Sequence, residues 1–276
     1  MKRAIFTLTL LANLSVHGAG INDYYKVENI PAPKGLDVQI GGLTFLPDGR
    51  LAACFHRGEV YTYNPKTKVW KLFADGLHEP LGIIAEDNHT LVVMQRPELT
   101  RLRDTDGDGE ADHYQTISDD FGMTGNYHEF AFGPARDKDG NYYVGLNLAS
   151  SGASIRPEIR GEFRHYGISR EQFYKNHKAG SGRMYSATPY RGWIMKIAPD
   201  GKTTPFASGF RSPNGVNFDA QGRLWATDNQ GDWLGTSKLF HIKPGRFYGH
   251  AASLAWKKGF TGAPLDHSPV ELAKLR

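Results

Sequence analysis

Residues 206–235 read FASGFRSPNGVNFDAQGRLWATDNQGDWLG, and this stretch indicates the fold of the chain. Two strand-like runs, Gly215–Phe218 and Arg223–Thr227, flank a turn that contains glycine, which is the pattern of a β-hairpin. Arg211 stands before the first run, and Asp228 opens a cluster of polar residues after the second. Because a hairpin brings its entry and its exit together, we expect a fixed cation and several oxygen donors on one rim, where they form a polar ligand site.

The same formula of strand, turn and strand recurs along the chain. Its copies begin at Gly42, Gly82, Phe130 and Gly215, and the first two begin 40 residues apart. Four short strands in a repeat of this length are typical of a propeller blade. We therefore predict an all-β fold, a β-propeller with four-stranded antiparallel blades, of which about four are present.

A closed ring requires the last blade to meet the first, because an open sheet edge leaves backbone groups unpaired. The final residues 270–276, VELAKLR, show no closing strand. We expect the chain to be the front portion of a larger propeller, and a compact ring of four blades is the alternative.

Composition excludes some classes of protein. The 276 residues are 39% hydrophobic and 12% aromatic, which is enough for a substantial core. The formal net charge of +4 is scattered along the chain, so nucleic-acid binding has little support. Cys54 is the only cysteine and lies in a strand-like run, so we expect a buried apolar side chain there rather than a catalytic thiol.

The N-terminus has the pattern of a secretory signal peptide over residues 1–20. Lys2 and Arg3 precede an apolar run that ends in small residues. The alternatives are a buried strand or a membrane anchor, for which the run is short. We therefore expect a periplasmic or secreted protein, without a membrane span, whose propeller domain covers residues 21–276.

An acidic loop is the most specific local motif. Asp104, Asp106, Asp108 and Asp112 alternate with small residues, and carboxylates at this spacing can wrap a calcium ion, which prefers about six to eight oxygen ligands. Gln115 stands where an EF-hand loop carries its bidentate glutamate. We expect a calcium-stapled loop between strands, and a plain acidic turn is the alternative.

His128 stands just before a strand that begins near Phe130. A histidine at a strand entrance can reach a central cavity and accept a proton near neutral pH, although a lone histidine is more often structural. The chain has no Gly-x-Ser-x-Gly elbow, Walker loop or dinucleotide fingerprint. Serine hydrolase, P-loop and nicotinamide chemistry therefore lack support.

Several short motifs also occur in an order shared with a known family. They are His128 with FGP at 132–134, RGWIMKIAPDG at 191–201, RSPNGVNF at 211–218, DNQGD at 228–232 and GRFYGH at 245–250. In this order they resemble the soluble quinoprotein glucose dehydrogenase and sorbosone dehydrogenase family, six-bladed propellers that use pyrroloquinoline quinone (PQQ) and calcium. The stretch at 95–109 is also similar to large exported "membrane-bound dehydrogenase" proteins, in which a propeller precedes further domains and often a cytochrome c module.

The resemblance implies roles for single residues. His128 would be the base that removes the hydroxyl proton while hydride leaves the sugar carbon. Arg211 would stabilise the negative charge that grows on the reduced cofactor. The implied cofactor-binding residues are Arg211, Ser212, Asn214 and Gln230, and the implied calcium-binding turn contains Gly231 and Asp232.

Three positions depart from the family pattern. Ser212 replaces an asparagine that contacts the quinone, and Tyr127 replaces the acidic neighbour of the histidine. His78, Glu79 and Pro80 stand in place of a turn that carries glutamine. The basic residues that clamp the cofactor in the family come from later blades, which this chain lacks.

We therefore expect an exported PQQ- and calcium-dependent dehydrogenase that oxidises a sugar or a related alcohol or aldehyde and passes electrons to an external acceptor such as a cytochrome c. The alternative is a non-catalytic propeller that binds carbohydrate or protein. A calcium-dependent hydrolase of the lactonase type would need several converging carboxylates, for which only Asp228 and Asp232 are candidates.

Overall fold

The computed structural model describes residue 20 and residues 23–150, 159–164, 184–232, 235–261 and 268–275. The chain divides into two compact units, residues 1–36 and residues 37–276, and every strand belongs to the second unit. The predicted signal peptide lies outside the described residues except for Gly20. Within the described ranges, no helix combines the length and the apolar character needed to cross a bilayer.

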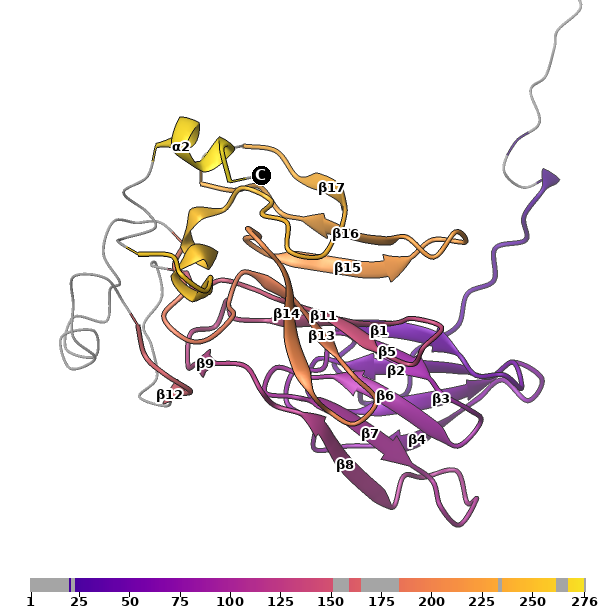
Figure 1. Cartoon of the computed structure of the whole chain (residues 1–276). Coiled ribbons are helices and arrows are strands. Elements are labelled where there is room, and N and C mark those ends of the chain that lie inside the picture. The colour runs from indigo at the N-terminus through magenta and orange to yellow at the C-terminus, as the bar shows by residue number, and fades with distance from the viewer. Residues whose placement is uncertain are drawn as a thin grey trace, which may run out of the picture. The chain divides into compact units, whose positions relative to one another are not determined.

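The second unit is built from antiparallel sheets that follow one another along the chain (Figure 1). Blade 1 contains β1 (Ile40–Phe45), β2 (Leu51–Phe55), β3 (Val60–Asn64) and β4 (Val69–Ala74). Blade 2 contains β5 (Ile83–Ala85), β6 (Thr90–Met94), β7 (Leu99–Arg103) and β8 (His113–Ser118). Blade 3 contains β10 (Ala131–Arg136), β11 (Tyr142–Leu146), β13 (Trp193–Ile197) and β14 (Thr203–Ser208). Blade 4 contains β15 (Pro213–Phe218), β16 (Leu224–Asp228) and β17 (Lys238–His241).

These sheets confirm the predicted propeller with four blades, and each blade pairs its strands in chain order. A smaller sheet joins β9 (Met123–Thr124) to β12 (Ile159–Arg160). It ties the long connection between β11 and β13 to the connection that precedes β10. The described C-terminal residues form a 3₁₀ helix, Ala251–Trp256, and the short helix α2 (Pro269–Ala273).

Aspartates at the tight turns explain why the first hairpin of a blade forms. Asp219 ends β15, and its Oδ1 accepts hydrogen bonds from the backbone amides of Gln221 and Arg223 at 3.0 and 2.9 Å. Gly222 completes this turn with φ of +75°, a conformation that side chains with a Cβ rarely adopt. Asp137 binds the amides of the turn after β10 in the same way.

Glycines let the first strands of neighbouring blades approach until their backbones touch. A Cβ on Gly42 would lie 2.8 Å from the Cα of Gly82, and a Cβ on Gly82 would lie 1.6 Å from the carbonyl oxygen of Gly133. A Cβ on Gly145 would lie 2.6 Å from the carbonyl oxygen of Pro213. These contacts leave no room for a side chain. The glycines that mark the sequence repeats are therefore the places where blades 1, 2 and 3 meet.

Apolar side chains fill the space between consecutive blades. Cys54 and Phe73 of blade 1 pack with Leu91 and Val93 of blade 2. A second cluster joins blades 2 and 3, and a third joins blade 3 to blade 4. Each blade after the first therefore has one face buried against the blade before it, which is how a propeller divides its core.

The other face of blade 1 is also apolar. Side chains alternate along β1, so Leu43 and Phe45 point away from Gly42 and hence away from blade 2. Leu43 is 55% exposed and Phe45 is 72% exposed. Their neighbours across the sheet continue the same face, which we call the outer face of blade 1: Leu43, Phe45, Leu51, Tyr61, Trp70 and Leu72.

Candidate functional site

Connections from several blades meet at one end of the strands, which we call the site end. Successive strands of a blade run in opposite directions, so the connections after the second and fourth strands share one end. Two hydrogen bonds join these connections across blades. Arg96, after β6, donates to the carbonyl oxygen of Asn126, which precedes β10. The amide of Leu148, after β11, donates to the carbonyl oxygen of Arg211, which precedes β15, at 2.9 Å.

His128 lies at this site end and is held by backbone groups. Its amide donates to Oδ1 of Asn126 at 3.0 Å, and its ring Nδ1 lies 2.9 Å from the carbonyl oxygen of Leu148. A carbonyl oxygen can only accept, so Nδ1 carries the proton and Nε2 of the neutral ring carries the lone pair. The ring is therefore held in the tautomer that a proton acceptor at Nε2 requires.

The surroundings of His128 keep the imidazole neutral. Burial lowers the pKa of His128 below its usual value, and the hydrogen bond to Leu148 opposes this effect. The positive charges of Arg211 and Arg96 lower the pKa further. A histidine with a lowered pKa is unprotonated near neutral pH, as a general base must be.

Arg211 and Ser212 are fixed through their backbone amides. The buried carboxylate of Asp228 accepts hydrogen bonds from the amide of Arg211 at 3.1 Å and from the amide of Ser212 at 2.8 Å. Lys238 lies 3.6 Å from the same carboxylate and balances its charge. Asp228 thus binds the two residues at the entry of the hairpin, as the sequence pattern indicated, and is not a free carboxylate facing a ligand.

Two polar atoms of this turn are buried without a hydrogen bond inside the described residues. They are Nη1 of Arg211 and Oγ of Ser212. A buried donor without an acceptor costs about 1–3 kcal/mol, so such atoms mark a place where a ligand or water completes the structure. An anionic ligand with several oxygen acceptors fits this pair of donors.

Asp232 lies on the other side of Arg211, which it reaches through charge rather than through a hydrogen bond. Its Oδ2 accepts a hydrogen bond from the amide of Met184 at 3.1 Å and lies 3.2 Å from Nε2 of His250. Burial raises the pKa of the Asp232 carboxyl, but the contacts with His250 and Met184 and the charge of Arg211 lower it to a net value below the usual one. The structure therefore brings His128, Arg211 and Asp232 together at the site end.

The remaining predicted ligand residues have different surroundings. Asn214 is exposed, and its Oδ1 accepts a hydrogen bond from Oγ1 of Thr227 at 2.6 Å. Gln230 is exposed, and Gly231 is half-buried beside it. Asn214 also lines a cavity of about 440 Å³ between the first strands of the four blades, together with Thr44, Ile83, Phe132 and other residues. His128 and Arg211 are not among the lining residues of that cavity.

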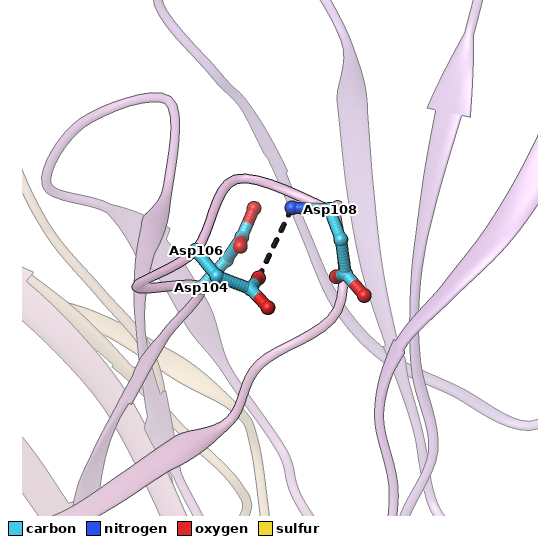
Figure 2. Close-up of side chains that lie close together, drawn as sticks. All are labelled: Asp104, Asp106 and Asp108. Atoms are coloured by element: carbon cyan, nitrogen blue, oxygen red, sulfur yellow. Dashed lines mark hydrogen bonds between the residues drawn. The ribbon is translucent and has the colours of Figure 1, made fainter.

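The acidic loop lies at the opposite end of blade 2. It connects β7 to β8, and its neighbour is His89 in the turn between β5 and β6, whose Nδ1 is 3.1 Å from Oδ2 of Asp104. Carboxylate oxygens of Asp104, Asp106 and Asp108 all lie within 4.8 Å of one another. Figure 2 shows the three side chains on one loop, where the amide of Asp108 donates to Oδ1 of Asp106 at 3.2 Å. The loop is therefore separate from the residues around His128.

Asp112 lies outside this group of carboxylates. Its two oxygens accept hydrogen bonds from the amide of Thr105, at 2.9 Å, and from the hydroxyl of the same residue. In this arrangement Asp112 closes the loop rather than contributing to a metal site. Lys71 also donates to the carbonyl oxygen of Asp108, so the loop already has one cation beside it.

Cys54 is fully buried between blades 1 and 2, and burial raises the pKa of its thiol to about 12. A thiol in this state is neither exposed nor ionised at ordinary pH. Cys54 is therefore a core side chain, as its position in the sequence indicated.

The architecture and the site end define an all-β propeller with polar ligand-binding connections at one end. The chain belongs to the protein family described as a domain of unknown function, DUF7133, whose family model matches residues 66–204. No curated protein matches the sequence.

Solved structures with the same fold include three enzymes of sugar metabolism or related classes. A candidate oxidoreductase (glucose dehydrogenase) from Thermus thermophilus is 17% identical, with a TM-score of 0.53 over 77% of this chain and 65% of that chain. The PQQ-bound form of aldose sugar dehydrogenase from Streptomyces coelicolor is 18% identical, with a TM-score of 0.51 over 82% of this chain and 66% of that chain. A carbohydrate-active enzyme of family AA12 from Trichoderma reesei is 13% identical, with a TM-score of 0.52 over 86% of this chain and 65% of that chain.

These likenesses concern the fold alone, because so few residues are identical. The chain spans 65–66% of the length of the three structures.

Proposed function

We propose that this chain carries the base and the anion-binding arginine of an exported, PQQ-dependent dehydrogenase that oxidises a sugar or a related alcohol or aldehyde. The observation that carries the proposal is the pairing of a neutral, oriented imidazole with a nearby guanidinium that has a buried, unpartnered nitrogen. The fold shared with sugar dehydrogenases and the order of the sequence motifs support the same class of reaction.

The residues present fit a polar, anionic quinone. Nη1 of Arg211 and Oγ of Ser212 need partners, and PQQ offers carboxylate and quinone oxygens. When bound, PQQ would supply the acceptor for two electrons. Arg211 and Ser212 would hold it, with Asn214 and Gln230 at the rim of the same end of the hairpin.

His128 would take the proton from the substrate. Its Nε2 has the lone pair that accepts the hydroxyl proton, while the C–H hydrogen leaves the same carbon as hydride. Arg211 would stabilise the negative charge that develops opposite the substrate, because its guanidinium is held in place before the reaction starts. The hydrogen bond from Nδ1 to Leu148 stabilises the imidazolium that forms.

The residues at the predicted calcium-binding turn fit calcium less well. Asp232 provides one carboxylate, which already binds the amide of Met184 and His250, whereas calcium takes about six to eight oxygen ligands. We therefore route no step of the reaction through calcium at Gly231 and Asp232. Calcium at the separate acidic loop remains our proposal for a structural ion.

Export through the N-terminal signal and electron transfer to an external acceptor such as a cytochrome c belong to the same proposal. A periplasmic or secreted quinoprotein needs such an acceptor, because the reduced cofactor must be reoxidised after each turnover.

The test is a titration of the intact protein with PQQ in the presence of calcium, followed by reduction of an artificial dye with several aldoses. We expect dye reduction in the wild-type protein and its loss in His128→Ala, whereas His113→Ala, which alters an exposed histidine on β8, should retain it. Binding of PQQ should weaken in Arg211→Gln. A folded protein that binds no PQQ and reduces no dye would overturn the proposal and favour a propeller that only binds carbohydrate or protein.

A further inference from the structure

One buried arginine outside the ligand-binding residues holds the segment that carries His128. Arg191 stands just before β13, and its side chain is fully buried, as is that of Glu129. Burying a guanidinium is costly unless its charge and its donors are matched. The contacts of Arg191 therefore indicate what this residue does.

The guanidinium of Arg191 binds both ends of one connection. Its Nε donates to the carbonyl oxygen of Gly122 at 2.8 Å. Its Nη1 donates to the carbonyl oxygens of Glu129 and Phe130 at 3.0 and 3.2 Å. Gly122 begins the segment 122–130 and Phe130 ends it, so one planar group closes the loop in which His128 lies.

The backbone of Arg191 is itself anchored. Its carbonyl oxygen accepts a hydrogen bond from Oγ of Ser186 at 2.8 Å, and Oγ of Ser186 accepts one from Nε1 of Trp256 at 3.0 Å. The next residue, Gly192, has φ of +84° and donates its amide to Leu146 at 2.8 Å. Arg191 is thus fixed to the sheet of blade 3, and it transmits that position to the segment 122–130.

Glu129 supplies the charge that balances Arg191. Burial lowers the pKa of Arg191 to about 10, and the negative charge of Glu129 opposes that effect. One oxygen of Glu129 accepts a hydrogen bond from the amide of Thr124 at 2.5 Å, so the same carboxylate also folds the segment onto itself. At neutral pH Arg191 therefore remains a cation and keeps its hydrogen bonds.

We propose that Arg191 is a positioning residue that holds the imidazole of His128 against Leu148. It acts through the backbone carbonyls of Glu129 and Phe130, which directly follow His128, and it touches neither substrate nor cofactor. The inference rests on the proposed function only in giving His128 a catalytic task. The orientation of the ring is a property of the protein without ligands.

The test measures the ring itself by NMR of the intact protein labelled in histidine. The chain has 11 histidines, so the resonance of His128 is assigned by its loss in His128→Gln. Arg191→Lys keeps the charge but loses the planar fork that reaches three carbonyls. We expect the Nδ1-protonated form of His128 to give way to a mixture of tautomers and its pKa to rise toward the ordinary value, because the loosened segment admits water.

Arg101→Lys is the matched control, because Arg101 forms a half-buried pair with Glu86 and has no contact with the segment 122–130. It should leave the titration of His128 unchanged. An unchanged tautomer and titration in folded Arg191→Lys would overturn the inference. Should Arg191→Lys fail to fold, Glu129→Gln and amide hydrogen exchange replace it, and exchange that rises across the whole chain rather than in residues 122–130 would also overturn it.

Activity separates this inference from the proposed function. If the protein reduces dye with a sugar, Arg191→Lys should lower kcat roughly 10²-fold with little change in KM, because a misplaced base affects the chemical step. If no dye is reduced, the proposed function fails while the NMR result on the ring still stands or falls by itself.

Discussion

The guanidinium of Arg211 lies near enough to the imidazole of His128 for its positive charge to lower the pKa of that ring. The two residues are 83 positions apart in the sequence, and each is bound to Leu148, His128 through the ring and Arg211 through its carbonyl oxygen. A single residue of blade 3 therefore sets the distance between the proposed base and the proposed anion-binding group.

The first prediction concerns pH. Arg211→Gln removes a positive charge, so the pKa of His128 should rise. A base works only when it is unprotonated, so the acid limb of the kcat/KM profile should move to higher pH, and kcat should fall by about 10²–10³-fold. Arg223→Gln, which alters an exposed arginine paired with Asp219, should change neither. An acid limb that stays in place in folded Arg211→Gln would contradict the electrostatic link.

The second prediction concerns Asp228. Asp228→Ala leaves the amides of Arg211 and Ser212 and the charge of Lys238 without a partner, and we expect a loss of about 3–5 kcal/mol in the free energy of unfolding. Asp228→Asn keeps one acceptor oxygen and should cost less. Urea denaturation measures both.

Asp219 offers the matched comparison for Asp228, because it binds two backbone amides at the opposite end of the same hairpin. Asp219→Asn should lower stability without changing the affinity for PQQ, whereas Asp228→Asn should weaken it. Equal affinities in the two variants would remove Asp228 from the support of the ligand site.

The third prediction concerns the contact between blades. In Gly82→Ala the new methyl group would start 1.6 Å from the carbonyl oxygen of Gly133, so the strands must separate. We expect a loss of at least about 3 kcal/mol or no folded protein. Gly235→Ala is the control, because no atom lies within 4 Å of its added Cβ, and it should unfold like the wild type.

The fourth prediction concerns the acidic loop. Three carboxylates within 4.8 Å repel one another, so calcium should raise the melting temperature by binding the folded state. The gain would be about 2.7 kcal/mol at a calcium concentration 100 times the Kd. Differential scanning calorimetry with calcium and with chelator measures the change.

Two variants give this measurement its specificity. Asp106→Asn should abolish most of the calcium response. Asp112→Asn should lower stability but retain the response, because Asp112 binds Thr105 rather than joining the three carboxylates. A wild-type melting temperature that ignores calcium would mean that the loop is only an acidic turn.

The sequence was a good guide to the blades, because the signals involved are local. Alternating apolar residues and turns with Asp or Gly predicted the hairpins that became β1 with β2, β5 with β6, β10 with β11 and β15 with β16. The two glycines used to count the repeats, Gly42 and Gly82, proved to touch across the blade boundary. Nothing local to either glycine shows that contact.

The sequence was a weaker guide to the site, because its parts meet through long-range contacts. The pattern around Arg211 and Asp228 did indicate that they lie at one rim, since a hairpin joins them. The buried pair of Arg191 and Glu129 was missed, because Arg191 stands in a motif that reads only as the start of a strand. The partnership of Asp232 with His250 was missed for the same reason, since a connection of irregular structure separates them.

The outer face of blade 1 has a consequence for the way this polypeptide behaves in solution. A sheet with apolar side chains on both faces is suited to a middle layer, as in a stack where each layer is covered twice. Blade 2 provides one of the two covers, and Leu43 and Phe45 remain open to water on the other side. Whatever shields them must itself be a twisted sheet with an apolar surface, and without such a shield we expect these side chains to draw copies of the protein into aggregates.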